Sequence, residues 1–245
     1  MIKINDTDGL VEYFKKQEKF TKDEIRAYYA ATESELKDNT LKWRIYKLMK
    51  SNVISSIGRG IYVISQKTTY QPEPDKYMEK ANKIFQSRYT EINYCIWYSG
   101  WLYSFMQHQP FSSFYIFEVE KEICKEVFHL FQDNKLNAFY HPNEQLIDDY
   151  VSNSSNAIII KPLISRSPVY NNKKIKLASI EKILVDIYCD RKIYPIFNLS
   201  EIMNIFENAY THYNINIAKL VNYARRRKKE QEIKEFISKH VIDLF

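Results

Sequence analysis

The chain has 245 residues, 45% of them hydrophobic and 15% aromatic, which indicates one or two folded domains and excludes a disordered chain. Its formal net charge of +6 permits binding to nucleic acid without requiring it. Three widely spaced cysteines fit reduced thiols better than a disulfide framework. The N-terminus lacks the apolar core of a signal peptide, and no run of about 18 apolar residues could span a membrane. We therefore expect a cytoplasmic protein with no membrane partner.

The first part of the chain predicts two helices in succession. Leu10, Val11 and Phe14 form the apolar stripe of a first helix that ends near residue 16. Thr21, followed three residues later by Glu24, is typical of a capping box at the start of a second helix, which we place at residues 22–29.

A third helix and a hairpin follow at residues 38–64. The apolar residues of the helix recur at spacings of three and four, which places them on one face. They are Leu41, Ile45, Leu48 and Met49. Strands at 53–57 and 61–64 flank the turn Gly58-Arg59-Gly60, where glycine suits the positive φ angles of a tight turn. Arg59 is expected to point into solvent.

Helix, helix, helix, hairpin is the order of a winged helix-turn-helix, whose third helix enters the major groove of DNA. The opposite face of that helix is basic and aromatic, and an arginine at the tip of the wing can reach the DNA backbone or minor groove. The candidate DNA-binding residues are Thr40, Lys42, Trp43, Arg44, Lys47 and Arg59. The alternative interpretation is a solvated basic helix beside an ordinary hairpin.

These patterns divide the chain into three parts. Residues 1–68 form the winged helix, residues 69–75 a linker with two prolines, and residues 76–245 a larger α/β domain that ends in several helices. Strands are expected at 94–98, 113–119, 136–140 and 157–164, and helices at 76–88, 101–106 and 121–132. The run AIIIKPLI at 157–164 is apolar enough to be buried on both faces of a sheet.

From residue 179 onward the pattern is helical. One helix carries Ile180, Ile183, Leu184 and Ile187, and Ser200 and Asn216 are expected to cap the next two. A last helix carries the apolar residues Ile233, Phe236, Ile237 and Val241.

Catalytic motifs are absent from the sequence. It contains no phosphate-binding glycine loop and no histidine or cysteine spacing for zinc, so we expect neither an enzyme nor a metal or other cofactor. The nearest approach is the cluster Glu118, Glu120, Lys121 and Glu122, which suggests a metal-dependent nuclease. Lys121 follows Glu120 directly, however, whereas such nucleases place the lysine two residues after a carboxylate. First-turn acids stabilised by the helix dipole explain the cluster as well.

The densest positive charge is the run at 225–229. Arg225, Arg226, Arg227 and Lys228 could contact DNA phosphates or an acidic partner. They also lie where a helix is expected to end, and cations are favoured there. Both interpretations remain open.

Three segments resemble the AbiEi-type antitoxins of bacterial abortive-infection systems, which are also transcriptional regulators. They are LKWRIYKLMKSNVISSIGRGIYVIS at 41–65, CIWYSGWLYSFM at 95–106 and SIEKILVDIYCD at 179–190. The first resembles the family's recognition helix and wing, and the second its strand and short helix. The third resembles its helix in which an acidic residue, a basic residue, aliphatic residues and an aspartate follow one another. In the third these are Glu181, Lys182, Ile183, Leu184, Val185 and Asp186.

The resemblance implies a repressor that binds double-stranded DNA, at inverted repeats in the promoter of its own operon. It also implies an antitoxin that counteracts a nucleotidyltransferase-like toxin of a type IV toxin–antitoxin system. Inverted repeats would require two copies of the protein on the DNA. Two other hypotheses stay open: a DNA-targeted metal-dependent nuclease, and a protein-interaction module that does not bind DNA.

Overall fold

The computed structural model describes residues 5–31, 33, 36–50, 53–65, 68–140, 142, 147, 154, 156–191, 194 and 196–240. The chain divides into two compact units, and each contains a hydrophobic core. Unit 1 comprises Met1–Thr69 and His212–Asn214, and unit 2 comprises Tyr70–Thr211 and Ile215–Phe245. The fold is mixed α/β, as predicted.

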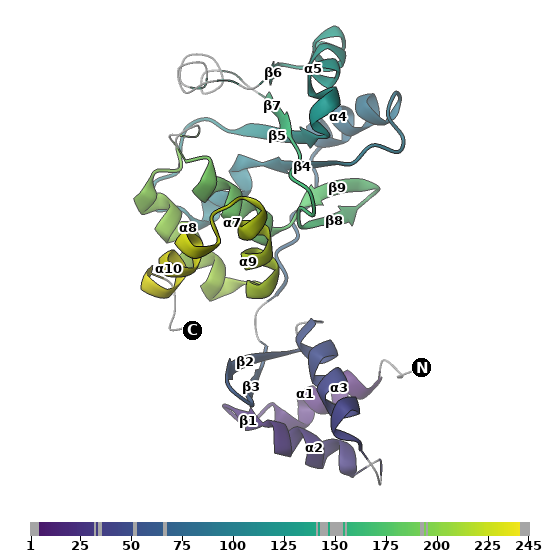
Figure 1. The fold of residues 1–245 in the computed structure, drawn as a ribbon, viewed down its shortest axis with the longest axis vertical. Helices are drawn as coiled ribbons and strands as arrows, with labels where there is room; N and C mark the ends of the chain where they lie inside the picture. The colour runs from purple at the N-terminus through teal and green to yellow at the C-terminus, as the bar shows by residue number, and fades with distance from the viewer. Residues whose placement is uncertain are drawn as a thin grey trace. The chain divides into compact units, whose positions relative to one another are not determined.

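Unit 1 combines three helices with a three-stranded antiparallel sheet (Figure 1). Its elements are α1 (Asn5–Phe14), β1 (Phe20–Thr21), α2 (Lys22–Ala30), α3 (Asp38–Lys50), β2 (Ile54–Gly58) and β3 (Ile61–Ile64). The strands lie in the order β1-β3-β2. The predicted order of three helices and a hairpin is present. The structure adds a strand that was not predicted, β1, in which Phe20 pairs with Tyr62 of β3. A strand of two residues is too short to show an alternation of apolar and polar residues in the sequence.

The local signals of unit 1 explain its helices. Thr21 accepts a hydrogen bond from the Glu24 amide at 3.3 Å, and the Glu24 carboxylate accepts one from the Thr21 amide at 2.7 Å, so the predicted capping box is confirmed. The buried core residues of the three helices are Leu10, Phe14, Ile25, Tyr29, Leu41, Ile45 and Leu48. Met49, predicted to share this face, is 39% exposed because it lies at the edge of the buried stripe.

Unit 2 is built on a six-stranded mixed sheet. Its strands are β4 (Tyr94–Tyr98), β5 (Phe114–Val119), β6 (Ala138–Tyr140), β7 (Ala157–Pro162), β8 (Val169–Asn172) and β9 (Ile175–Ala178). They lie in the order β6-β7-β5-β4-β9-β8. β7 runs parallel to both β5 and β6, whereas β4 runs antiparallel to β5 and parallel to β9. The first four residues of β7 are buried, as its apolar run predicts.

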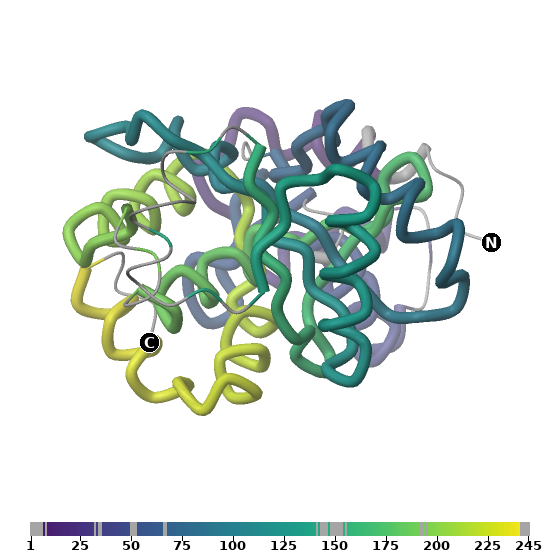
Figure 2. Tube along the Cα trace, turned by 90° about the horizontal axis from the view of Figure 1, so that it is seen from above, coloured from purple at the N-terminus to yellow at the C-terminus, as the bar shows by residue number. Residues whose placement is uncertain are grey.

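Helices cover both faces of this sheet. The helical elements are α4 (Lys76–Gln86), η1 (Ser99–Phe105), η2 (Lys121–Ile123), α5 (Cys124–Asp133), α7 (Ile180–Cys189), α8 (Leu199–His212), α9 (Ile217–Arg226) and α10 (Glu230–His240). α4 and α5 pack on one face, against Ile96, Phe117 and Ile160. The C-terminal helices lie on the opposite side, with the strands between them and α5 (Figures 1 and 2).

Two sequence expectations for unit 2 change. Residues 70–75, predicted to belong to a linker, are held by unit 2: Asp75 caps α4 and accepts a hydrogen bond from Tyr115 at 2.7 Å, and Tyr170 donates to the Pro72 carbonyl at 3.0 Å. The predicted cap of α8 is also wrong.

The residue that caps α8 is Asn198, whose side chain accepts a hydrogen bond from the Glu201 amide at 3.0 Å. Ser200 lies inside the helix and donates its own hydroxyl to Asn198. Asn216 does cap α9, through the Lys219 amide at 2.9 Å. Val241, predicted in the last helix, lies outside the described residues.

Candidate nucleic-acid interface and a buried charge network

The outward face of α3 is aromatic and basic. Thr40, Trp43 and Lys47 are all exposed, and Trp43 retains 47% of its accessible surface. The Lys47 ammonium lies 4.1 Å from the centre of the Trp43 ring, one helical turn away. These three side chains therefore lie where the sequence predicts them.

Arg59 is exposed at the turn between β2 and β3. The following Gly60 has φ of 73°, a left-handed conformation that costs other residues energy, and this angle closes the tight turn. The chain passes from the end of α3 into this hairpin within a few residues, so one continuous segment carries both candidate contacts.

Arg44 does not belong to the exposed face, which corrects the prediction. Its side chain is only 12% exposed, its guanidinium donates to Glu33 at 2.6 Å, and it lies 4.5 Å from the centre of the Tyr29 ring in α2. The reason is its position on the helix: it is three residues after Leu41 and four before Leu48, beside the buried stripe. Arg44 therefore joins α3 to α2.

Lys42 is exposed, but its positive charge has an acidic neighbour. Its ammonium lies 3.1 Å from Asp38, which also accepts hydrogen bonds from Lys22 and Arg26. Hydrogen bonds from these three cations hold the pKa of the Asp38 carboxyl well below its usual range. Part of the Lys42 charge is thus balanced within unit 1 and is less available for a phosphate.

Charge is unevenly distributed along unit 1. Residues 39–72, which begin in α3 and include the whole hairpin, contain six lysines and arginines and neither an aspartate nor a glutamate. The acidic residues of unit 1 all precede this segment. Lys42 and Arg44 pair with the upstream acids Asp38 and Glu33. The remaining positive charge of this segment favours association with a polyanion.

We expect Arg44→Ala to lower the free energy of unfolding of unit 1 by about 1–2 kcal/mol, because it removes a charged hydrogen bond and a cation–π contact. Trp43 fluorescence during urea unfolding measures this change in a variant that lacks the two other tryptophans. Lys47→Ala, on the exposed face, serves as the control. An equal effect of the two substitutions would contradict the inward position of Arg44.

The basic run at the end of α9 is largely neutralised within unit 2. Arg225 binds Glu230 through two hydrogen bonds of 2.5 and 2.9 Å, and Arg227 is 13% exposed and paired with Asp186 and Asp190. Arg226 donates to the Ser165 hydroxyl, Lys229 pairs with Glu232 at 2.6 Å, and Lys228 is exposed. Arg227 is therefore unavailable for the phosphate contact that was one of the two interpretations of this run, and Arg225 has a carboxylate partner.

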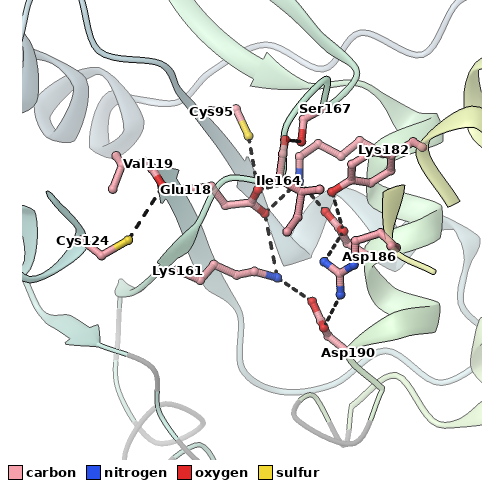
Figure 3. A network of polar contacts seen from close by, with 12 residues as sticks. Cys95, Glu118, Val119, Cys124, Lys161, Ile164, Ser167, Lys182, Asp186 and Asp190 are labelled. Carbon is pink, nitrogen blue, oxygen red and sulfur yellow. Dashed lines mark hydrogen bonds and ion pairs between the residues drawn. The ribbon is translucent and has the colours of Figure 1, made fainter. Parts of the chain in front are cut away.

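Arg227 belongs to a network of buried charges between the sheet and the C-terminal helices. Figure 3 shows Glu118, Lys161, Lys182, Asp186 and Asp190 of this network. Strand pairing supplies the first part: Cys95 on β4 lies opposite Glu118 on β5, which lies opposite Lys161 on β7. These side chains form one row across three strands, on the face opposite α4 and α5. Glu118 is 1% exposed.

The helix α7 supplies the second part. Lys182 and Asp186 are four residues apart and completely buried, and Asp190 follows four residues later. The Lys182 ammonium lies 2.7 Å from Glu118 and also donates to Asp186. Lys161 donates to Asp190, which closes the contact between sheet and helix.

The helix α9 supplies the last part. Tyr223 donates its hydroxyl to Asp186 at 2.9 Å, and the Arg227 guanidinium donates to Asp186 at 2.9 Å and to Asp190 at 2.6 Å. Three carboxylates and three cations thus face one another, and together they join β5, β7, α7 and α9.

The charges of this network stabilise one another. Burial opposes the charge of Lys182, yet Asp186 and Glu118 raise its pKa well above the ordinary range. Burial likewise opposes the charge of Asp186, but Lys182, Lys161 and Arg227 lower its pKa. Lys182 and Asp186 are thereby held in their ionised forms, and we interpret the network as a structural connection between sheet and helices.

The cluster after β5 does not converge on a common point. Glu118 faces Lys182, whereas Glu120 accepts hydrogen bonds from the Asn93 amide and side chain at 3.2 and 3.0 Å. Lys121 and Glu122 are exposed in η2. Within the described ranges, no group of three or more histidine, cysteine, aspartate or glutamate side chains is placed to hold a metal ion. The geometry gives the nuclease hypothesis no support.

Comparison with known proteins places the chain in a family. Residues 40–243 match a family of unknown function (DUF6577), and the chain belongs to it. The match begins in α3 and covers the hairpin and nearly all of unit 2. No curated protein matches the chain. Among the described residues, no helix has both the length and the apolar character needed to cross a membrane.

Proposed function

We propose that unit 1 is a winged helix that binds duplex DNA, and that the chain is a transcriptional regulator. The observation that carries this proposal is the acid-free segment 39–72, whose helix and hairpin turn expose Trp43, Lys47 and Arg59. Lys47 and Arg59 can bind phosphates, and the outward face of α3 can enter the major groove.

The resemblance to AbiEi-type antitoxins extends the proposal. On that basis the protein represses its own operon and unit 2 counteracts a nucleotidyltransferase-like toxin encoded beside it. The test is the neighbouring gene and its product: co-expression of this chain should restore growth to cells that produce the toxin. If co-expression does not restore growth, the antitoxin role is overturned and the proposed DNA binding is tested separately.

DNA binding itself is tested by selection from a pool of randomised duplexes at low salt, followed by fluorescence anisotropy with the enriched duplex. We expect log K to fall linearly with log salt concentration. In Lys47→Ala plus Arg59→Ala, the slope should become shallower by about 2, since each phosphate contact contributes about 0.9.

The control is Lys121→Ala plus Lys125→Ala, which removes the same charge from exposed positions of unit 2. It should leave affinity and slope nearly unchanged. An equal loss in both double variants would indicate a response to net charge alone. A pool that shows no enrichment would overturn the proposal and favour the protein-interaction hypothesis.

A further inference from the structure

Two large aromatic side chains project from α3 on the side away from its core. Trp43 is 47% exposed and Tyr46 is 61% exposed, whereas Leu41, Ile45 and Leu48 close the core of unit 1 on the opposite side. The packing of unit 1 therefore does not account for Trp43 and Tyr46. Exposed aromatic side chains on a helix of this kind point to a binding partner with an apolar surface.

Duplex DNA offers one such surface in the major groove. The C5-methyl group of thymine is the apolar group that base pairs present there, and cytosine lacks it. The face of an aromatic ring can cover a methyl group, and the nearby Lys47 supplies a charge for the phosphates. We infer that Trp43 and Tyr46 select DNA by contact with thymine methyl groups, an inference that rests on the DNA-binding function proposed above.

Helix geometry sets the spacing of these contacts. Trp43 and Tyr46 are three residues apart, which corresponds to about 4.5 Å along the helix axis. Successive base pairs are separated by about 3.4 Å. The two rings therefore match thymines on neighbouring base pairs, and the selected sites should contain such a pair at a fixed position.

The experiment replaces thymine with uracil, which pairs in the same way but lacks the methyl group. The enriched duplex is synthesised in both forms and its affinity for the full chain is measured at one salt concentration. We expect the uracil duplex to bind about 15-fold more weakly, from about fourfold for each of the two methyl groups buried. Trp43→Ala should reduce this ratio to about fourfold or less, and Trp43→Phe should retain most of it.

Phe111→Ala is the matched control, because Phe111 is a fully exposed aromatic residue of unit 2. It should leave the thymine-to-uracil ratio unchanged. Equal affinity of the unaltered protein for both duplexes would overturn this inference and leave the proposed function intact. Loss of binding to both duplexes at low salt would overturn both. A ratio that Trp43→Ala does not alter would assign the selection to other residues.

Discussion

Replacement of Lys182 by methionine is expected to lower the free energy of unfolding of unit 2 by about 3–5 kcal/mol, the usual cost of removing one partner from a buried ion pair. Methionine keeps the approximate length of the side chain but not its charge. Glu118 would retain Lys161, whose ammonium is 4.0 Å away, and Asp186 would lose one of its cations. Both carboxylates would remain buried and less well compensated.

Tryptophan fluorescence can isolate unit 2 in this experiment. The chain has three tryptophans, and Trp43→Phe leaves the two that belong to unit 2, of which Trp97 is fully buried. Urea unfolding of Lys182→Met in this background gives the change in stability. Lys219→Met is the control: Lys219 is 42% exposed and 3.5 Å from Glu181, and exposed pairs contribute about 1 kcal/mol or less.

A second substitution distinguishes lost charge balance from altered packing. If the Glu118 charge is destabilising in the absence of Lys182, Glu118→Gln should restore about 1 kcal/mol or more of unfolding free energy to the Lys182→Met protein. In the unaltered protein, the same substitution should lower the unfolding free energy. Additive losses would mean that Glu118 and Lys182 do not interact. A loss below about 1 kcal/mol in Lys182→Met would contradict the buried network.

Three of the six charged residues of this network could be grouped together from the sequence. Lys182 and Asp186 of α7 and its C-cap Asp190 recur every four residues in a largely apolar stretch, so a polar stripe follows from the helical period. Their partners Glu118 and Lys161 come from strands about 60 and 20 residues upstream, respectively, and the pairing of those strands is not encoded in any local pattern. The six charges could therefore not be assembled from the sequence.

The hairpin of β8 and β9 was not predicted, for a local reason. Its turn residues Lys173 and Lys174 have φ of 47° and 67°. Two-residue hairpin turns with both angles positive usually carry Asn-Gly or Asp-Gly, and two lysines give no such signal. Short apolar runs of β-prone residues were predicted more accurately: β4 lies at the predicted 94–98 and β3 at the predicted 61–64.

For α3, the sequence predicts which face of the helix is buried but not the environment of every side chain. The helical period separates Trp43 and Lys47 from the core correctly, and both are exposed. Arg44 lies at the boundary between the two faces, where periodicity does not decide its environment. Its guanidinium contacts the Tyr29 ring and the Glu33 carboxylate, and both contacts depend on how α2 packs against α3.

The charge of Asp186 leads to an expected dependence of stability on pH. Its carboxyl has a lowered pKa in the folded protein, because Lys182, Lys161 and Arg227 outweigh the opposing effect of burial. A carboxyl of this kind adds stability above its unfolded pKa, and the contribution is lost as the pH falls through the folded pKa. With an ordinary value of 3.8, the contribution of Asp186 is fully present at neutral pH.

Asp186→Asn should therefore destabilise unit 2 by about 3 kcal/mol or more at pH 7, since it leaves buried cations without a counter-charge. The difference from the unaltered protein should narrow as the pH falls below about 4, because the Asp186 carboxyl of the unfolded chain then takes up a proton while the folded one, with its lower pKa, stays ionised. Urea midpoints of both proteins across this range provide the measurement, with Asp133→Asn on the exposed end of α5 as the control. A difference that stays constant with pH would show that the loss in Asp186→Asn does not come from the charge of Asp186, because only the ionised aspartate balances Lys182 and Arg227.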